Sequence, residues 1–257
     1  MAGAGKELRV GAKNGSGPPV RLFSYAPGRG AAHATAIYAG IRPGTALITD
    51  GYELYNGLAI ENQLNHLGCW AHARRGFIKA EDAVPKALRT PQLTATRFVK
   101  LIGKLFAAEA RSATWLPVRR QRLRRRYSAR VLQAIEALLR EQLPTVVPGS
   151  LLGKTMLYLH GQWPKLVRYV ENGSWPISNN PCENAIRPFI LGRKGWLFAT
   201  TVAGANTSAN LYSLVETCKA NGVDPYQYLA WLFKKLLQAS TADDYAALLP
   251  WTMAPTP

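Results

Sequence analysis

Hydrophobic residues in the first third of the chain occur in short runs that are separated by small or polar residues. The runs VRLFSYAP and TALITDGY are typical of buried strands, and the small-residue stretch from Ala31 to Tyr38 between them favours a helix. A helix over Glu53–Ile60, a strand over Leu64–Trp70 and a helix over AHARRGFIKA continue the alternation. Strands that alternate with helices at these short intervals predict a parallel α/β unit, in which ligands gather at the carboxyl ends of the strands.

The middle of the chain, from Arg97 to Leu143, changes to a helical and strongly basic pattern. Only Glu109 and Glu136 oppose twelve basic residues between Arg97 and Arg140, so i,i+4 ion pairs cannot neutralise this segment. A solvated helix face is one interpretation of the segment, and a surface that faces DNA is the other, which we expect. The candidate DNA contacts are six of its clustered arginines: Arg119, Arg120, Arg122, Arg124, Arg125 and Arg126.

The two ends of the chain predict different structures. Residues 1–19 are rich in glycine and end in a proline pair, which indicates a flexible lead or a severed edge of structure. Near the other end, hydrophobic residues at i, i+3, i+4 and i+7 from Leu211 to Cys218 predict a packing helix. Asn221-Gly222 would end that helix, and Asp224-Pro225 would begin the next one.

Composition indicates a folded protein with a polyanionic partner. The 257 residues are 47% hydrophobic, enough to fill a core, and 32 Lys and Arg against 15 Asp and Glu give a formal net charge of +17. Such a field attracts polyanions by releasing their counterions, so nucleic acid is the leading partner, although ribosomal and other basic proteins share this balance. We expect a cytoplasmic location and no membrane partner, because no leader and no apolar run of spanning length occurs.

Two carboxylates carry the candidate chemistry. Metal-dependent cleavage of phosphodiesters needs carboxylates that converge on two cations. Asp50 directly follows the apolar run TALIT, and Glu183 lies 133 residues later in SNNPCENAIRP, where Ser178 or an asparagine could cap a helix. Alone the pair is a weak signal, because aspartates are common in turns and glutamates are favoured near helix starts without any function.

Four separated segments strengthen that signal: ITDGYELYN, GCWAHARRGF, SNNPCENAIRPFILGRKGWLF and NLYSLVETCKANGVDPYQYLAWLF. Together they resemble the insertion-sequence-66 family of transposases, from about Arg21 to about residue 240. The resemblance implies a ribonuclease H-like mixed sheet flanked by helices, a basic helical insertion, and a magnesium- or manganese-binding triad of two aspartates and one glutamate. The domains expected from it are a lead over 1–20, a catalytic core over 21–96 and 176–203, a helical insertion over 97–175, a C-terminal helical domain over 204–240 and a tail over 241–257.

The resemblance assigns two members of the triad, Asp50 and Glu183, as catalytic residues and metal ligands. Asn180 and Arg187 would lie beside Glu183, near phosphate. The first aspartate of the pattern has no counterpart, because no Asp precedes Asp50, and the segment around Glu7 does not resemble the family. We therefore expect an N-terminally truncated catalytic domain whose independent activity is in question, with a non-catalytic DNA-binding remnant as the alternative. An active complex would contain DNA, as transposon ends and target, and further copies of the chain, either with or without accessory proteins of the same element.

Two further groups are candidate DNA contacts. His72, Arg74 and Arg75 in CWAHARRGF would flank the active site, with the arginines holding phosphate; a helix surface beside a buried Trp70 is the other interpretation. The second group, on an expected flexible turn, consists of Arg193, Lys194 and Trp196. A zinc site at Cys69 and His72 is disfavoured, because structural zinc needs four ligands and no second pair is nearby.

Overall fold

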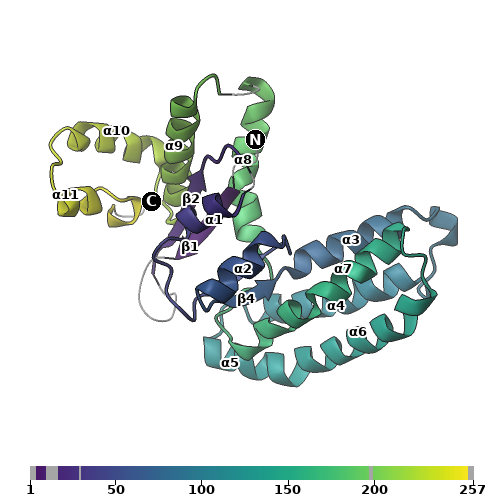
Figure 1. Cartoon of the computed structure of the whole chain (residues 1–257). Helices are drawn as coiled ribbons and strands as arrows, with labels where there is room; N and C mark the ends of the chain where they lie inside the picture. The colour runs from purple at the N-terminus through teal and green to yellow at the C-terminus, as the bar shows by residue number, and fades with distance from the viewer. Residues whose placement is uncertain (1–3, 10–16, 29, 197–198, 254–257) are drawn as a thin grey trace. The chain divides into compact units, whose positions relative to one another are not determined.

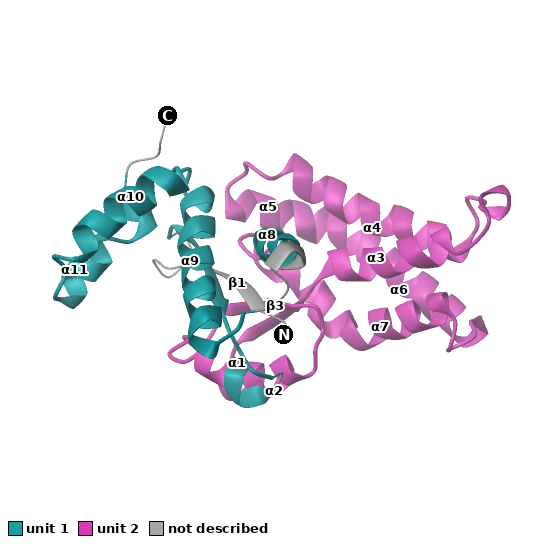
Figure 2. Cartoon of the chain, turned by 90° about the horizontal axis from the view of Figure 1, so that it is seen from above, with its two compact units in different colours: residues 1–33, 180–257 teal, residues 34–179 magenta. Residues whose placement is uncertain are grey.

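The computed structural model of the chain describes residues 4–9, 17–28, 30–196 and 199–253, with 4–9 and 193–196 described by backbone alone. The chain divides into two compact units (Figure 2). Residues 1–33 and 180–257 form unit 1, and residues 34–179 form unit 2. The sequence of unit 2 is therefore inserted within that of unit 1.

A small parallel sheet carries the predicted alternation in unit 2. Strand β3 (Ala46–Thr49) pairs with β4 (Asn65–Gly68), and helix α2 (Leu54–Glu61) connects them. A parallel pair needs such a crossover, since a tight turn can join only antiparallel strands. Helix α1 (Ala31–Ile37) precedes β3, and the hydrophobic cluster of this part is formed by Tyr38, Leu47, Leu58, Ala59 and Leu64.

The larger part of unit 2 is a helical bundle (Figure 1). Its long helices are α3 (Trp70–Asp82), α4 (Thr94–Arg111), α6 (Ala129–Gln142) and α7 (Leu151–Leu166). A 3₁₀ turn (Lys86–Leu88) lies between α3 and α4, and helix α5 (Pro117–Leu123) and a π-helical turn (Arg124–Ser128) lie between α4 and α6. A second 3₁₀ turn (Leu143–Thr145) precedes α7, and a third (Val167–Glu171) follows it. Phe98, Ile102 and Leu105 of α4, at helical spacing, are fully buried in its core.

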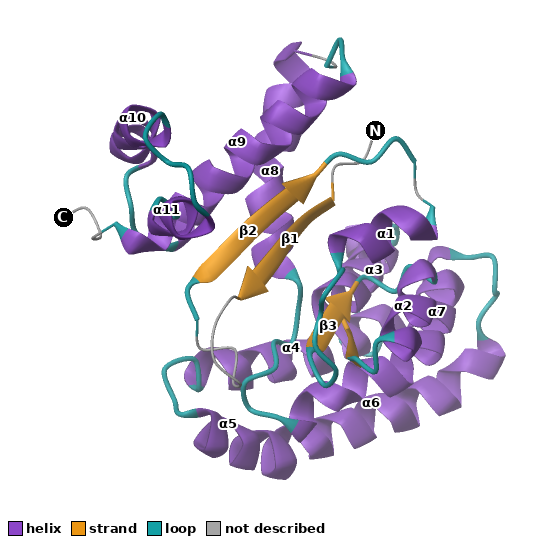
Figure 3. Ribbon diagram, turned by 60° about the vertical axis from the view of Figure 1, so that its left-hand side comes forward, coloured by secondary structure: helices purple, strands orange, loops and turns teal. Residues whose placement is uncertain are grey.

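Unit 1 combines a two-stranded sheet with the helices of the C-terminal part of the chain (Figure 3). Strand β1 (Ala4–Arg9) pairs antiparallel with β2 (Pro19–Ser24), and the helices are α8 (Asn180–Trp196), α9 (Val202–Ala220), α10 (Pro225–Leu236) and α11 (Ala242–Ala247), followed by a 3₁₀ turn (Pro250–Thr252). The amide of Phe23 donates a hydrogen bond to Ser213 Oγ at 2.8 Å, so a helix side chain pairs with the backbone of β2. The Phe23 side chain packs with Ala185 of α8 and Ala209 of α9.

The mixed α/β class is confirmed, and the structure corrects three details. The run VRLFSYAP forms β2, but β2 pairs antiparallel with β1 and not in parallel with β3; the described strands form two sheets of two strands each. Strand β1 lies in the segment expected to be a flexible lead. Residues 193–196, expected on a flexible turn, belong to helix α8. The ribonuclease H-like arrangement stays a prediction.

Candidate active site and nucleic-acid interface

Asp50 stands at the carboxyl end of β3, as the sequence predicts, and its side chain is exposed. Its Oδ1 accepts a hydrogen bond from the amide of Tyr52 at 3.2 Å. Its backbone carbonyl oxygen accepts one from the hydroxyl of Tyr158 on α7 at 2.7 Å. The backbone of Asp50 is thus fixed to the bundle while its carboxylate faces solvent.

A neutral hydrogen-bonded pair lies next to Asp50 in the sheet. The Oγ1 of Thr49 and the Nε2 of His66 on β4 are 2.8 Å apart, and both residues are buried. Thr49 Oγ1 also accepts a hydrogen bond from the amide of Gly51 at 3.3 Å. Burial lowers the pKa of His66 to about 4, with smaller contributions from the positive charges of Lys165 and Arg168. The imidazole is therefore uncharged at neutral pH.

Helix α7 supplies polar groups to the same corner of unit 2. The ammonium of Lys165 donates hydrogen bonds to Asn56 Oδ1 at 2.7 Å and to Gln162 Oε1 at 3.3 Å. Burial lowers the pKa of Lys165, and the carboxylate of Glu53 partly opposes this effect. Gln162 lies so close to Gly51 that a Cβ there would stand 2.9 Å from its Cδ. Sequence reasoning found no chemistry in α7, because helical periodicity does not reveal that the helix passes the end of β3.

Glu183 lies in the first turn of α8, in unit 1. Asn180 begins the helix three residues before it, and Arg187 follows it by four, so all three share one face. Asn180 and Arg187 are exposed, and Glu183 is half-buried. The predicted grouping of these residues on one helix face is present, while Asp50 belongs to the other unit, so their approach to one metal site stays a prediction.

A groove of about 230 Å³ lies between α3 and α7. Its described lining consists of His72, Arg75, Gly76, Lys79, Leu151, Lys154, Thr155 and Tyr158. Two predicted DNA contacts, His72 and Arg75, thus line one groove, and the His72 ring lies 6.1 Å from that of Tyr158. Arg74 is half-buried and is not among the lining residues.

Arg124 is the clearest correction among the predicted DNA contacts. Its side chain is 1% exposed and forms a two-pronged ion pair with Glu109, with Nε–Oε1 and Nη2–Oε2 distances of 2.8 and 2.5 Å. It also donates to the carbonyl oxygens of Tyr169, Asn172 and Trp175 at 2.6–2.9 Å. A guanidinium held in this way joins α4, the π-helical turn and the segment after α7, and it is not available to a nucleic acid.

The other arginines of the run differ in their surroundings. Arg120 is half-buried and donates to the carbonyl oxygens of Ser112 and Gly173 at 3.1 Å, which is a structural role. Arg119 is exposed and lies over the ring of Trp115, 4.2 Å from its centroid. The remaining three are exposed: Arg122, Arg125 and Arg126. The side chains of Arg193, Lys194 and Trp196 lie outside the described residues.

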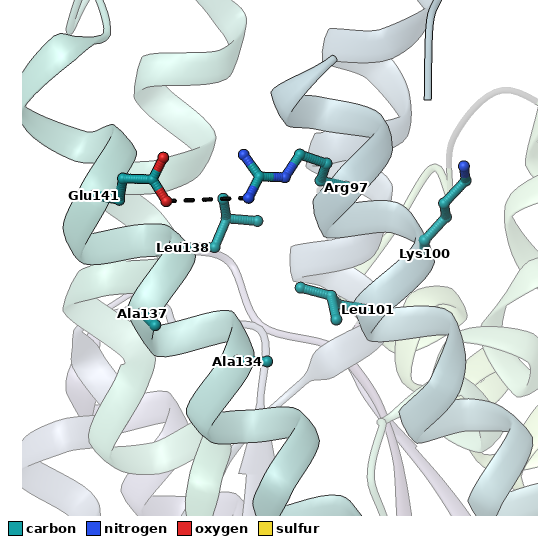
Figure 4. A pocket seen from close by; sticks show the side chains of 7 residues that line it. All are labelled: Arg97, Lys100, Leu101, Ala134, Ala137, Leu138 and Glu141. Carbon is teal, nitrogen blue, oxygen red and sulfur yellow. Dashed lines mark ion pairs between the residues drawn. The ribbon is translucent and has the colours of Figure 1, made fainter. Parts of the chain in front are cut away.

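A second groove, of about 490 Å³, opens between α4 and α6 (Figure 4). Arg97 Nη2 lies 4.0 Å from Glu141 Oε2 across it, and the dashed line in the figure marks this pair. The floor is apolar and is formed by Leu101, Ala134, Ala137 and Leu138. Arg97 and Lys100 also line this groove, but Glu141 offsets part of their charge, whereas the groove between α3 and α7 has no carboxylate among its described lining residues.

The thiol of Cys69 does not suit a zinc site. It is buried and donates a hydrogen bond to Asn179 Oδ1 at 2.9 Å. Across the described ranges, no three His, Cys, Asp or Glu side chains gather as a metal site. Within the same ranges, no helix has both the length and the apolar character to cross a membrane.

Family models match most of the chain. The model described as "Transposase IS66 family" matches residues 8–207, and the "IS66 C-terminal element" matches residues 213–251. Among curated proteins of Sinorhizobium fredii (strain NBRC 101917 / NGR234), the chain is 30% identical to the uncharacterized protein y4qI, over 94% of this chain and 44% of that protein. It is 28% identical to the uncharacterized protein y4jD, over 92% of this chain and 46% of that protein. The chain thus spans less than half the length of these relatives, and no solved structure matches it.

Proposed function

Because the chain belongs to the transposase IS66 family, we propose that it supplies catalytic groups for DNA cleavage and strand transfer in transposition. The observation that carries the proposal is the exposed carboxylate of Asp50, held at the carboxyl end of a parallel strand inside the matched region. Parallel α/β units bind their ligands at this position. Glu183, with Asn180 and Arg187 on its face of α8, would complete the chain's contribution.

The two carboxylates suit a hard divalent cation. Mg²⁺ and Mn²⁺ prefer oxygen ligands, and Asp50 uses one carboxylate oxygen for a single backbone hydrogen bond, which leaves ligand capacity on the other. Asp50 and Glu183 would hold such a cation, which would supply stabilisation of negative charge on the reacting phosphate. Tyr158 holds the Asp50 backbone, and the uncharged His66 adds no positive charge to compete for the carboxylate.

Contacts to DNA would come mainly from basic side chains, together with polar and aromatic ones. On unit 2 these are Arg119, Arg122, Arg125 and Arg126, together with His72 and Arg75 of the groove between α3 and α7. On unit 1 they are Arg187 with the amide of Asn180, and by position Arg193, Lys194 and Trp196. Contacts of this kind go mainly to phosphates and fix the position of a duplex without reading its sequence.

The test is nicking of supercoiled plasmid in Mn²⁺ by the wild-type chain and by its Asp50→Asn and Glu183→Gln variants. The matched control is Glu141→Gln, which neutralises an exposed carboxylate in the groove between α4 and α6. We expect both site variants to lose at least about a hundredfold in rate, the scale on which a charge-stabilising group contributes, while the control keeps its rate. Equal rates in all four proteins would overturn the proposal.

One observation favours a second function. The exposed arginines Arg119, Arg122, Arg125 and Arg126 can bind phosphate without any carboxylate or metal ion. A non-catalytic DNA-binding protein would bind DNA equally well with and without chelator and would nick no plasmid. Wild-type binding that chelator does not weaken, together with no nicking in Mn²⁺, would establish this function in place of catalysis.

A further inference from the structure

The groove between α3 and α7 is built from two helix faces that carry cations. Arg75 and Lys79 stand one turn apart on α3, and Lys154 and Tyr158 stand one turn apart on α7. None of the eight described lining residues is an aspartate or glutamate. The groove therefore presents positive charge from both walls.

Two acidic residues at the end of α3 have partners outside the groove. At the end of α3, Asp82 pairs with Arg89 at 3.0 Å, and Glu81 accepts a hydrogen bond from Thr96. Neither Lys79 nor Lys154 forms an ion pair with a carboxylate of the described residues. The charges of Lys79 and Lys154 are thus not neutralised by an ion pair within the described residues.

One residue joins this groove to the candidate active site. Tyr158 lines the groove, and its hydroxyl donates to the backbone carbonyl oxygen of Asp50 at 2.7 Å. Its ring lies 6.1 Å from that of His72, so two aromatic rings stand in the same stretch of the groove. A chain of phosphates that lies along the groove would be led toward the carboxylate of Asp50.

We propose that the groove between α3 and α7 binds the sugar–phosphate backbone of the DNA strand that Asp50 acts on. Arg75, Lys79 and Lys154 bind successive phosphates, and the rings of His72 and Tyr158 lie against the sugar or base at the end near Asp50. Recognition is independent of sequence, because only backbone charge is contacted. This inference rests on the proposed function for its orientation toward Asp50, while its binding step is tested without catalysis.

The experiment compares two triple variants with equal loss of charge. The groove variant is Arg75→Gln, Lys79→Gln and Lys154→Gln, and the control is Lys86→Gln, Lys100→Gln and Lys104→Gln, which removes three exposed lysines elsewhere in unit 2. Binding of a labelled duplex is followed by fluorescence anisotropy with chelator present, between 50 and 200 mM salt. Thermal melting checks that both variants are folded.

We expect the groove variant to lose at least about tenfold in affinity and the slope of log K against log salt to fall by about 2 to 3, because each phosphate contact contributes about 0.9. The control should change the slope by less than about 1, the value of one contact. Equal losses in the two variants would overturn the inference, and so would the absence of DNA binding by the wild-type chain.

Plasmid nicking separates this inference from the proposed function. If the wild-type chain nicks plasmid and the groove variant nicks with the same half-saturating DNA concentration, the inference is wrong and the proposed function stands. If the wild-type chain binds DNA but nicks nothing while the groove variant binds weakly, the groove is confirmed and the catalytic proposal fails.

Discussion

The Oγ1 of Thr49 and the Nε2 of His66 lie 2.8 Å apart in the parallel sheet, and both residues are buried. Thr49 directly precedes Asp50 in the chain. The pKa of His66 is about 4 in the folded protein, against an ordinary value of 6.5. Below pH 6.5 the imidazole of His66 binds a proton in the unfolded chain, whereas in the folded chain it binds one only near pH 4. The contribution of this histidine to the free energy of unfolding is therefore fully present above pH 6.5 and is lost as the pH falls toward 4.

We therefore expect the free energy of unfolding of the wild-type chain to fall between pH 7 and pH 4.5 by about 2 kcal/mol more than that of His66→Gln, which cannot titrate. Urea unfolding of both proteins at the two pH values measures the difference. His160→Gln is the matched control, since it removes an exposed histidine on α7 and should follow the wild-type pH dependence. Parallel curves for the wild type and His66→Gln would contradict the buried, neutral state.

Replacing Arg124 with lysine should strongly destabilise unit 2. The change removes the two-pronged ion pair with Glu109 and leaves the carbonyl oxygens of Tyr169, Asn172 and Trp175 without their donor. Breaking a buried ion pair costs about 3–5 kcal/mol. Arg125→Lys, at the exposed neighbouring position, should stay within about 0.5 kcal/mol of the wild type in urea unfolding. Similar midpoints for the two variants would show that Arg124 is not structural.

Gly51→Ala should disturb the position of Asp50. Gly51 has a φ of 98°, a backbone conformation that costs other residues about 1–3 kcal/mol, and the new methyl group would stand 2.9 Å from Gln162 Cδ. We expect lower stability and reduced nicking. Gly57→Ala, in the middle of α2 with no atom within 4 Å of its Cβ position, should instead stabilise by up to about 1 kcal/mol. A neutral effect at Gly51 would mean that the turn can rearrange without cost.

Asp224→Ala tests the junction of α9 and α10 in unit 1. The Asp224 side chain accepts a hydrogen bond from the amide of Gln227 at 2.8 Å and caps α10. Loss of such a cap costs about 1 kcal/mol, and faster hydrogen exchange of the first-turn amides of α10 would report it. Asp224→Asn retains an acceptor and should exchange as the wild type does. Equal acceleration in both variants would assign the effect to charge and not to capping.

Sequence periodicity was sufficient for most of the helices and strands. The helix end at Asn221-Gly222 and the cap at Asp224 were both predicted, because capping depends on neighbouring residues alone. The pairing of β1 with β2 was not predicted, because the glycine-rich composition of residues 1–19 does not indicate a strand. The position of β2, the partner of β1, depends on its packing against α9, which lies far away in the sequence. Mixed α/β content could therefore be predicted, while the sheet topology could not.

The parts of the candidate site that depend on a single segment could be predicted from the sequence. Asp50 at a strand end and Glu183 near a helix start both follow from local pattern. The contributions of Tyr158 and Lys154 depend on the packing of α7 beside α3, and a local sequence pattern does not predict this packing. Arg124 was assigned to DNA for the same reason, because a run of arginines does not reveal which one faces the core.

The nesting of unit 2 within unit 1 sets an order of events during synthesis. The amide of Arg21 on β2 bonds to the hydroxyl of Thr217 on α9, its partner 196 residues later. At a synthesis rate of about 5–20 residues per second, Thr217 of α9 is made roughly 10–40 s after Arg21 of β2. All residues of unit 2 are made before α8, so unit 2 can fold on the ribosome before α9 is available to pair with β2. Unit 1 can complete its fold only after its C-terminal helices have been made.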